Sequence, residues 1–423
     1  METETKQIRT PFVRLVAALF IGELGFGLAI VTSMMLLLTF KLTEIDPNNV
    51  VVDLSLVTGI AVLFALIGNP IGGAISDRTQ LKFGRRRTWI LLGSILGCTC
   101  LMGIAFATDV LMVLVFWCAA QGMLNFSIAA ITALIADQVD ESKRGRASGI
   151  VSISQAIGGL MGFALMNALT NTPIVVRFAA TVVISILLAI ICCILVKEGK
   201  FAYRKPQTVK KFGGLASFFP SPRKYPNFTW AWITRFFIMA ANSYYIYYAI
   251  ILGQRFGYTE AQITQKMLIL MVVYTLFTVL SSLLGGFLSD KFRKQKLFVW
   301  SSAFVVAVGL IFLALANNFD IFIVGAGISG FGIGIYLAVD LALNTRILPN
   351  KENTAKDLGI INVASTLPQS IVPVFAPIVL AGWGFIGFFL LFAAFAVLSG
   401  LTVMPIPEMP PKPLAPDEGA PEL

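Results

Sequence analysis

Three charged residues interrupt long apolar stretches of the sequence. Glu23 lies near the middle of one stretch, Arg235 in another, and Asp340 near the end of a third. A carboxylate inside an apolar span is costly unless it is protonated or paired, so it can take up a proton on one side of a membrane and release it on the other. We therefore expect Glu23 to couple proton movement with Arg235 as its cationic partner, and Asp340 to be a further candidate. The alternative is a static buried pair.

Amide and phenol side chains occur inside the same kind of stretch. Their hydrogen bonds and aromatic faces suit a neutral polyhydroxylated ligand such as a sugar. Each amide is equally suited to bond a neighbouring helix. Tyr247 and Tyr248 fit the aromatic belt at the membrane interface. The candidates for lining a substrate cavity are Gln121, Asn125, Gln155, Asn242, Tyr244, Tyr245, Tyr274, Tyr336, Asn362 and Gln369.

The composition excludes several classes of protein. Hydrophobic residues make up 57% and charged residues 13% of the 423 residues, and the mean hydropathy is +0.84. Soluble globular chains have about 45–50% apolar and about 25% charged residues. The sequence has no histidine, which rules out a histidine triad or relay and most zinc and haem sites. We expect a membrane protein that is not an enzyme and that uses no metal and no cofactor.

Apolar stretches of membrane-spanning length recur along the whole chain. A helix needs about 20 apolar residues to cross a bilayer. Such stretches occupy residues 12–40, 51–74, 88–107, 110–136, 147–169, 174–196, 228–251, 264–288, 297–316, 321–345, 356–380 and 383–405. The sequence therefore predicts an all-α integral membrane protein with twelve transmembrane helices.

The basic residues indicate the orientation of these helices. If the first stretch begins in the cytoplasm, the outer loops carry only Lys41, Arg177, Arg255 and Lys266 of the 32 basic residues. Because basic residues concentrate in cytoplasmic loops, we expect both termini in the cytoplasm and a multi-pass protein of the plasma membrane. The positive charge then faces anionic lipid of the inner leaflet rather than nucleic acid.

A polar segment divides the twelve stretches into two sets of six. The heptapeptide GGAISDR at Gly72–Arg78 recurs as GGFLSDK at Gly285–Lys291. Such internal similarity indicates structural repeats, and repeats of this kind in a membrane enclose a central site. We expect an N-terminal six-helix bundle over residues 1–196, a cytoplasmic linker over 197–227, a C-terminal six-helix bundle over 228–405 and a disordered cytoplasmic tail over 406–423.

The loop after the second stretch carries a resemblance to a known family. Gly72–Arg87, GGAISDRTQLKFGRRR, is similar to the loop signature of the major facilitator superfamily. Its spacing resembles that of sucrose/proton symporters and the related glycoside–cation symporter group, as do NFTWAWITRFF (Asn227–Phe237), RGRASG (Arg144–Gly149) and KDLGIINVASTLPQ (Lys356–Gln369). The resemblance implies two pseudo-symmetric six-helix bundles in a monomer. The second copy of the loop lacks the Gly-Arg-Arg sequence.

The same loop suggests a cytoplasmic gate. Gly72 and Gly73 allow two helices to approach closely. Asp77 lies near a basic cluster and can accept hydrogen bonds from the N-terminus of a neighbouring helix. The resemblance implies contacts of Asp77 with residues 355–357 and of Asp290 with residues 145–147. The expected gating set is Gly72, Gly73, Asp77, Arg78, Gly84, Arg85, Arg86, Arg144, Arg146, Asp290 and Lys291. The alternative is a basic loop that only sets the topology.

These features together predict a secondary active transporter in the lipid bilayer that works by alternating access. The resemblance favours proton-coupled symport of a sugar or glycoside. A proton-driven exporter of drugs or metabolites is the first alternative, and a membrane receptor or scaffold without transport activity is the second. In the favoured case the partners are protons and a small molecule, with no nucleic acid.

Overall fold

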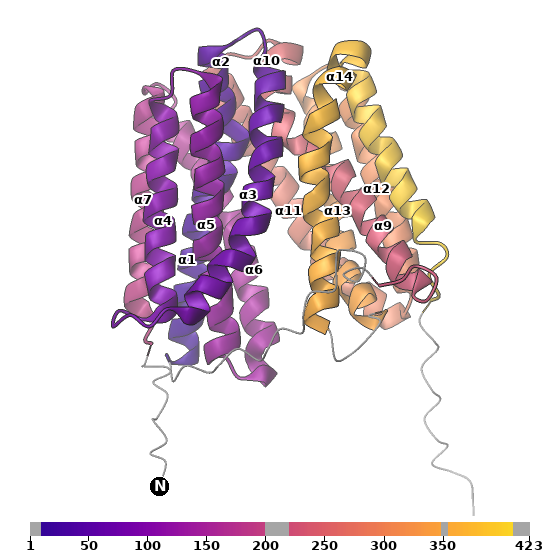
Figure 1. Ribbon diagram of the computed structural model, residues 1–423. Helices are drawn as coiled ribbons and strands as arrows, with labels where there is room; N and C mark the ends of the chain where they lie inside the picture. The colour runs from indigo at the N-terminus through magenta and orange to yellow at the C-terminus, as the bar shows by residue number, and fades with distance from the viewer. Residues whose placement is uncertain (1–9, 199–219, 348–353, 409–423) are drawn as a thin grey trace, which may run out of the picture.

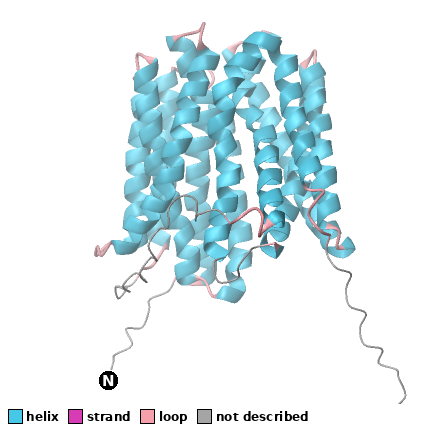
Figure 2. Ribbon diagram, turned by 45° about the vertical axis from the view of Figure 1, so that its right-hand side comes forward, coloured by secondary structure: helices cyan, strands magenta, loops and turns pink. Residues whose placement is uncertain are grey.

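The computed structural model describes residues 10–198, 220–347 and 354–408. Every regular element in these ranges is a helix (Figure 2). The helices are α1 (Phe12–Thr32), η1 (Ser33–Leu37), α2 (Leu38–Ile45), α3 (Val50–Arg78), α4 (Arg85–Ala105), α5 (Val110–Gln138), α6 (Glu141–Ala168), α7 (Ile174–Leu195), α9 (Pro226–Asn242), η2 (Ser243–Tyr247), α10 (Tyr248–Phe256), α11 (Glu260–Phe292), α12 (Gln295–Leu315), α13 (Phe319–Arg346) and α14 (Thr354–Thr402).

Eleven helical segments in the described ranges are long and apolar enough to cross a membrane, and the last contains two crossings. α14 has 49 residues, which is about 74 Å of helix, whereas the hydrocarbon core is about 30 Å thick. Gly384 interrupts α14 with φ of 61° and ψ of −168°. The chain turns at the top of Figure 1 and runs back as the yellow helix. The prediction of an all-α protein with twelve transmembrane helices is confirmed.

The helices form two halves that lie side by side (Figure 1). In the first half, α1 packs against α6 and α7, and both α3 and α4 pack against α5. In the second half, α12 and α11 pack against α13, and α9 packs against α14. Two helix pairs join the halves, α3 with α14 and α6 with α11. Each pair combines the second crossing of one half with the fifth crossing of the other, as expected for two repeats.

Glycine residues allow a close contact between α1 and α6 in the first half. A Cβ atom on Gly27 of α1 would lie 2.2 Å from the carbonyl oxygen of Gln155 in α6. A Cβ atom on Gly158 of α6 would lie 2.2 Å from the carbonyl oxygen of Leu24 in α1. The two backbones therefore touch, which is the packing that small residues permit between membrane helices.

The first and seventh crossings each contain a segment that is not α-helical. In the first crossing, α1 and α2 are joined by the π-helix η1. In the seventh crossing, α9 and α10 are joined by the 3₁₀-helix η2. Because the two crossings occupy equivalent places in the two halves, the irregular segments meet where the halves face each other.

The two ends of the bundle differ in how the halves are joined. We call the end where α1 begins and α14 ends the lower end, and the opposite end the upper end, as in Figure 1. Near the upper end, Ser55 of α3 and Tyr247 of η2 form a hydrogen bond of 2.8 Å. Arg177 of α7 forms an ion pair with Glu260, the first residue of α11. Both contacts cross between the halves, so the upper end is closed.

Candidate functional site

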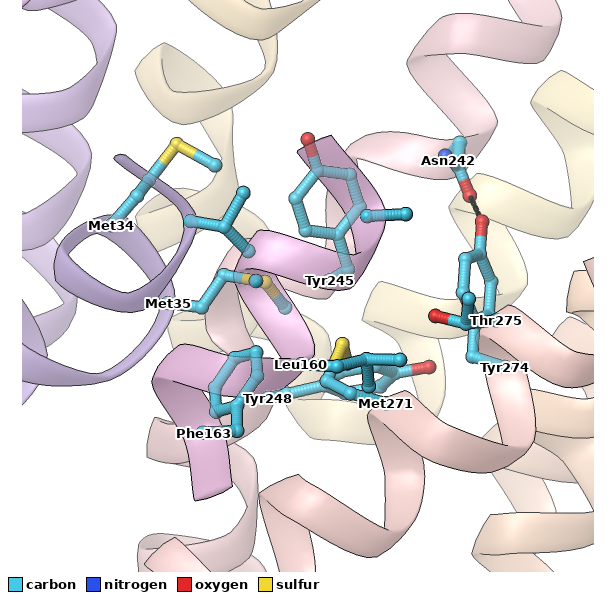
Figure 3. Close-up of a pocket in the computed structure, with 13 residues that line it drawn as sticks. Met34, Met35, Leu160, Phe163, Asn242, Tyr245, Tyr248, Met271, Tyr274 and Thr275 are labelled. Carbon is cyan, nitrogen blue, oxygen red and sulfur yellow. Dashed lines mark hydrogen bonds between the residues drawn. The ribbon is translucent and has the colours of Figure 1, made fainter. Parts of the chain in front are cut away.

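A cavity of about 200 Å³ lies between the two halves (Figure 3). The first half contributes residues from α1, η1 and α6, and the second half contributes residues from α9, η2, α10 and α11. The lining residues are Val31, Met34, Met35, Ala156, Gly159, Leu160, Phe163, Asn242, Tyr245, Tyr248, Met271, Tyr274 and Thr275. The irregular segments η1 and η2 thus form part of its wall.

The wall of this central cavity combines apolar surface with a few hydrogen-bonding groups. The hydroxyl of Tyr274 donates to Oδ1 of Asn242 at 3.0 Å, which fixes the amide so that its Nδ2 group remains a donor (Figure 3). Met34 and Met35 lie on the side of the first half, and Met271 lies on the side of the second half. None of the described lining residues is charged. The cavity therefore suits a neutral ligand with both apolar and hydrogen-bonding parts.

The structure brings three of the predicted cavity residues to this wall, namely Asn242, Tyr245 and Tyr274. Tyr248 also lines the cavity, although its place in the sequence suggested the membrane interface. Tyr247 is buried and bonded to Ser55, so it is not an interfacial residue either. Tyr247 is the last residue of the 3₁₀-helix η2 and Tyr248 is the first residue of α10, and both are fully buried.

The other predicted cavity residues lie elsewhere. The hydroxyl of Tyr244 forms a hydrogen bond of 2.9 Å with Ser329, and the hydroxyl of Tyr336 donates to Asp340 at 2.7 Å. Within α5, Nδ2 of Asn125 donates to the carbonyl oxygen of Gln121 at 2.8 Å. The remaining three, Gln155, Asn362 and Gln369, are half-buried, exposed and half-buried, and are not part of the described cavity wall.

Asp340, not Glu23, is the ionic partner of Arg235. The Arg235 guanidinium lies 2.5 Å from Oδ2 of Asp340 and donates to Ser365 at 2.6 Å. Asp340 and Tyr336 belong to α13, Arg235 to α9 and Ser365 to α14. The pair therefore ties three helices of the second half together. The sequence suggested that Arg235 pairs with Glu23, because the first and seventh crossings are equivalent. Instead, Arg235 pairs with a residue of its own half.

Glu23 is isolated by comparison. Its side chain belongs to α1 and is 8% exposed. It forms no hydrogen bond or ion pair with any residue that the structure describes. Cys192 of α7 packs against the neighbouring Gly22. A carboxylate in such a place has no cation to offset the cost of its charge.

Arg86 is the centre of a polar cluster at the lower end of the first half. Its guanidinium lies 2.5 Å from Asp77 and 2.8 Å from Asp137, and it donates to Ser76 at 2.7 Å. Arg85 also contacts Asp137 at 2.8 Å. The predicted gating residues Asp77, Arg85 and Arg86 are therefore brought together, with Asp137 of α5 as a partner that the sequence motif does not contain.

Glu198, which follows α7 in the chain, also contacts this cluster. Its carboxylate accepts hydrogen bonds from the backbone N–H groups of Arg86 and Arg87 at 3.0–3.1 Å and so caps the N-terminus of α4. Gly84 has φ of 115°, and a Cβ atom there would lie 2.3 Å from Oε2 of Glu198. Burial raises the pKa of Glu198 above its ordinary value, and the N–H groups act in the opposite direction.

The second half repeats this arrangement. The carboxylate of Glu408 accepts a hydrogen bond of 3.1 Å from the backbone N–H of Lys296 in the first turn of α12. The carbonyl oxygen of Pro407 accepts a hydrogen bond of 2.8 Å from Arg346, and Ile406 is buried. Residues 406–408 thus pack against the bundle, although the sequence suggested a disordered tail from 406 onward. A glutamate just after the last crossing of each half was the signal that could have identified both caps.

The remaining gating residues have different environments. A Cβ atom on Gly72 would lie 2.7 Å from Cα of Phe126, so Gly72 permits the expected close approach. At Gly73, no atom of the described residues lies within 4 Å of such a position. Gly73 therefore does not serve the packing role that the sequence suggested. Arg144 donates to the carbonyl oxygens of Val139 and Ala136 at the C-terminus of α5. Arg78, Arg146 and Lys291 are exposed.

The expected contacts of Asp77 and Asp290 with neighbouring helices involve side chains outside the described part of the structure. These are the side chain of Asp290 and the side chains near the start of α14. Asp77 itself is 58% exposed and has Arg86 as its ionic partner.

Two known protein sequences are similar to part of the chain. A stretch of 149 residues is 32% identical to the tetracycline resistance protein, class C, of Escherichia coli, covering 35% of this chain and 36% of that protein. A stretch of 118 residues is 30% identical to an uncharacterized transporter of Buchnera aphidicola subsp. Schizaphis graminum, covering 28% and 29% of the two chains. The chain thus matches about a third of the length of these relatives.

Solved structures with the same fold include three transporters. A D-xylose-proton symporter matches with a TM-score of 0.69 and 16% identity, over 94% of this chain and 98% of that one. The xylose transporter of E. coli in a partially occluded inward-open conformation matches with 0.71 and 15%, over 95% and 99%. A bacterial homolog of the human lysosomal transporter Spinster, inward-facing and occupied, matches with 0.70 and 15%, over 92% and 96%.

The family profile of the Major Facilitator Superfamily matches residues 15–272 and 261–422, two overlapping ranges that together cover nearly the whole chain. The two side-by-side halves and the cavity between them agree with that assignment. The chain belongs to the Major Facilitator Superfamily, whose members are membrane transporters.

Proposed function

We propose that this chain is a secondary active transporter that works by alternating access and couples the symport of a sugar or glycoside to protons. The observation that carries the proposal is the central cavity, whose wall comes from both halves and whose described residues are uncharged. The donor group of Asn242 and the hydroxyls of Tyr245 and Thr275 are hydrogen-bonding groups for a neutral ligand, and the tyrosine rings give it aromatic surface.

The proposed orientation places the lower end in the cytoplasm of the cell and the upper end outside the plasma membrane. The basic residues of the lower loops support this orientation. The contacts Ser55–Tyr247 and Arg177–Glu260 then close the outer side. In this orientation the described conformation has its outer side closed, and we propose that the protein is a monomer with both termini inside.

Glu23 is the group that we assign to proton coupling. It is buried with no cationic partner among the described residues, so its charged form is costly. A conformational change that alters its surroundings can therefore make Glu23 take up or release a proton. In contrast, the carboxylate of Asp340 is stabilised by an ion pair with Arg235 and by a hydrogen bond from Tyr336. We assign the Arg235–Asp340 pair to the structure of the second half rather than to proton movement.

Proton-driven export of an amphipathic compound is a second candidate. It is favoured by the three methionines of the cavity, because thioethers adapt to varied apolar and aromatic ligands. The 32% identity to a tetracycline resistance protein supports the same candidate. Import and export differ in the direction of the proton gradient that drives accumulation, which makes them separable in one experiment.

The test is flux through purified protein in proteoliposomes of defined orientation. Radiolabelled sucrose, methyl glucoside, an aryl glucoside and tetracycline are supplied with and without a pH gradient of either sign. Accumulation of a sugar or glucoside that requires an acidic outer side supports symport. If tetracycline alone accumulates, and this accumulation requires a pH gradient of the opposite sign, the protein belongs to the exporter class. Absence of flux for every solute contradicts both.

Glu23→Gln provides the test of coupling in the same vesicles. We expect it to lose uphill accumulation while retaining exchange of labelled for unlabelled substrate, because exchange requires no net proton release. Asp340→Asn serves as the comparison, since it leaves Arg235 without its partner. Removing one partner of a buried pair costs about 3–5 kcal/mol, so this variant should lose thermal stability together with both activities. Proton-driven accumulation by Glu23→Gln would contradict the assignment.

A further inference from the structure

A second and larger cavity lies at the upper end of the molecule. Its volume is about 850 Å³, which is in the usual range for small-molecule sites. It shares no described lining residue with the central cavity. The first half contributes α2, α3 and the start of α7, and the second half contributes α10 and α11. We call it the upper vestibule.

The accessible charge in the upper vestibule is negative. Two carboxylates line it, Glu44 from the first half and Glu260 from the second, with 57% and 51% of their side chains exposed. Each has one cationic partner, Lys41 and Arg177 respectively, and both partners have only 6% of their side chains exposed. The cations are therefore covered, whereas the carboxylate oxygens retain free lone pairs that face solvent.

Arg177 is held in place by more than its ion pair. Its Nε and Nη2 groups donate to the carbonyl oxygens of Thr172 and Thr170 at 3.1 and 2.5 Å. The guanidinium thus donates hydrogen bonds to three different acceptors, so it does not attract an anion into the vestibule. Lys266 of α11, whose ammonium group lies 4.1 Å from the ring centroid of Phe319, is not part of the vestibule wall.

An unused polar group and an apolar surface complete the wall. Thr39 of α2 is 4% exposed, and its hydroxyl has no hydrogen-bond partner among the residues that the structure describes. A buried hydroxyl without a partner is unfavourable, so a ligand that bonds to it gains affinity. Tyr258, Ile250 and Ile263 give apolar surface on the side of the second half.

We propose that the upper vestibule binds an organic ammonium ion with an aromatic or aliphatic body, and that this binding holds the upper end closed. The ammonium group pairs with Glu44 and Glu260, and the body lies on the apolar wall. The walls belong to both halves and separate when the upper end opens, so a bound ligand has to leave first. The inhibitory part of the proposal rests on the alternating access proposed above. The binding part does not.

Binding is tested with three probes of similar shape and different charge, namely 2-phenylethylamine, 2-phenylethanol and 3-phenylpropanoate. Their affinities are measured by calorimetry on the full-length protein in lipid nanodiscs, with empty nanodiscs to subtract partition into lipid. We expect the amine to bind best. Equal binding of the alcohol and the amine, or stronger binding of the carboxylate, overturns the proposal.

Variants locate the site. Glu44→Gln and Glu260→Gln should each weaken amine binding by up to about fivefold, which is the usual effect of one partly exposed charge. Thr39→Val should weaken it several-fold without lowering the unfolding temperature, because the lost hydroxyl had no partner. Asp320→Asn is the matched control, since this exposed carboxylate of α13 is not part of the vestibule wall. Equal loss in Asp320→Asn would mean that only the overall charge matters.

Inhibition is tested by flux of the substrate found in proteoliposomes, with amine added on the upper side. We expect the maximal rate to fall and the KM to stay constant. A rise in KM alone, together with weaker amine binding in Tyr245→Phe, would place the amine in the central cavity and overturn the proposal. If no solute is transported, the calorimetry still decides on the site, so the two proposals fail separately.

Discussion

Arg86 concentrates the polar contacts at the lower end of the first half. Its side chain contacts α3 through Ser76 and Asp77 and contacts α5 through Asp137. Its backbone N–H group is bound by Glu198, just beyond α7. A single residue at the start of α4 therefore connects α4 with α3, α5 and the segment that follows α7. The motif identified Arg86 from the sequence, but Asp137 and Glu198 are distant in sequence and become partners only through the fold.

Glu198 allows a prediction about stability and pH. Glu198→Ala should lower the free energy of unfolding by about 0.5–2 kcal/mol, because two N–H groups of α4 lose their cap. Glu198→Gln keeps a hydrogen-bond acceptor, so its free energy of unfolding should be close to that of the parent protein at pH 7. Burial raises the pKa of Glu198, so protonation of Glu198 adds stability below the ordinary pKa of glutamate, and this added stability is lost as the pH rises through the raised value.

The measurement is the apparent unfolding temperature of both variants in detergent between pH 7 and pH 4.5. The parent should gain stability relative to Glu198→Gln as the pH falls. A constant difference across this range would show that the ionisation of Glu198 is not coupled to folding. If Glu198→Gln instead gained stability relative to the parent at low pH, folding would lower the pKa of Glu198 and the prediction would be wrong.

Equivalent helices of the two halves are both interrupted, but by different kinds of irregular helix. The first and seventh crossings are each broken near the seam, one by a π-helix and the other by a 3₁₀-helix. These breaks bring Met34, Met35 and Tyr245 to the central cavity. Helix periodicity in the sequence predicts the crossings but not a local change from α to π or 3₁₀, because such changes depend on what the neighbouring helix presents.

Two adjacent glycines of α3 give a matched test of helix packing. Gly72→Ala should destabilise the protein by about 1–3 kcal/mol, because its methyl group meets Phe126 on α5. Gly73→Ala should be neutral or stabilise by up to about 1 kcal/mol, because its methyl group meets no atom and alanine favours the helix. Thermal unfolding of both variants in the same detergent separates them. Equal effects would mean that α3 and α5 are not packed as described.

At the scale of the whole molecule, the halves are joined by polar contacts at the upper end. Ser55–Tyr247 lies next to the central cavity, and Arg177–Glu260 lies in the wall of the upper vestibule. The two halves also contact each other along α3–α14 and α6–α11. Opening the upper end requires the two polar contacts to break, so they contribute to the balance between the two conformations.

Glu260→Gln should shift that balance toward the upper-open state. A partly exposed ion pair is worth up to about 1 kcal/mol, which corresponds to a change of up to about fivefold in the ratio of the two states. The readout is the rate at which a membrane-impermeant thiol reagent, added from the upper side, labels Met35→Cys in a variant without the native cysteines. Asp320→Asn controls for surface charge. Unchanged labelling in Glu260→Gln would show that the ion pair does not hold the upper end.

The sequence predicted the architecture more completely than the site. The number of crossings and the two halves follow from hydropathy and from the repeated heptapeptide, because lipid requires continuous apolar helices. The hydrogen-bonding chemistry of Asn242, Tyr245 and Tyr274 predicted their place at the cavity, where the structure has them. The partner of Arg235, the inward position of Tyr248 and the cap by Glu198 were not predictable, because each depends on the rotation of a helix about its axis, which hydropathy does not specify.

Residues 404–408 have a practical consequence for handling the protein. They follow the last helix, yet Lys296 contacts Met404 and Glu408, and Arg346 contacts Pro407. An affinity tag joined directly after Thr402 would replace the peptide that covers the beginning of α12. A tag joined beyond Glu408 leaves that peptide intact, so fusion partners for purification or fluorescence belong downstream of it.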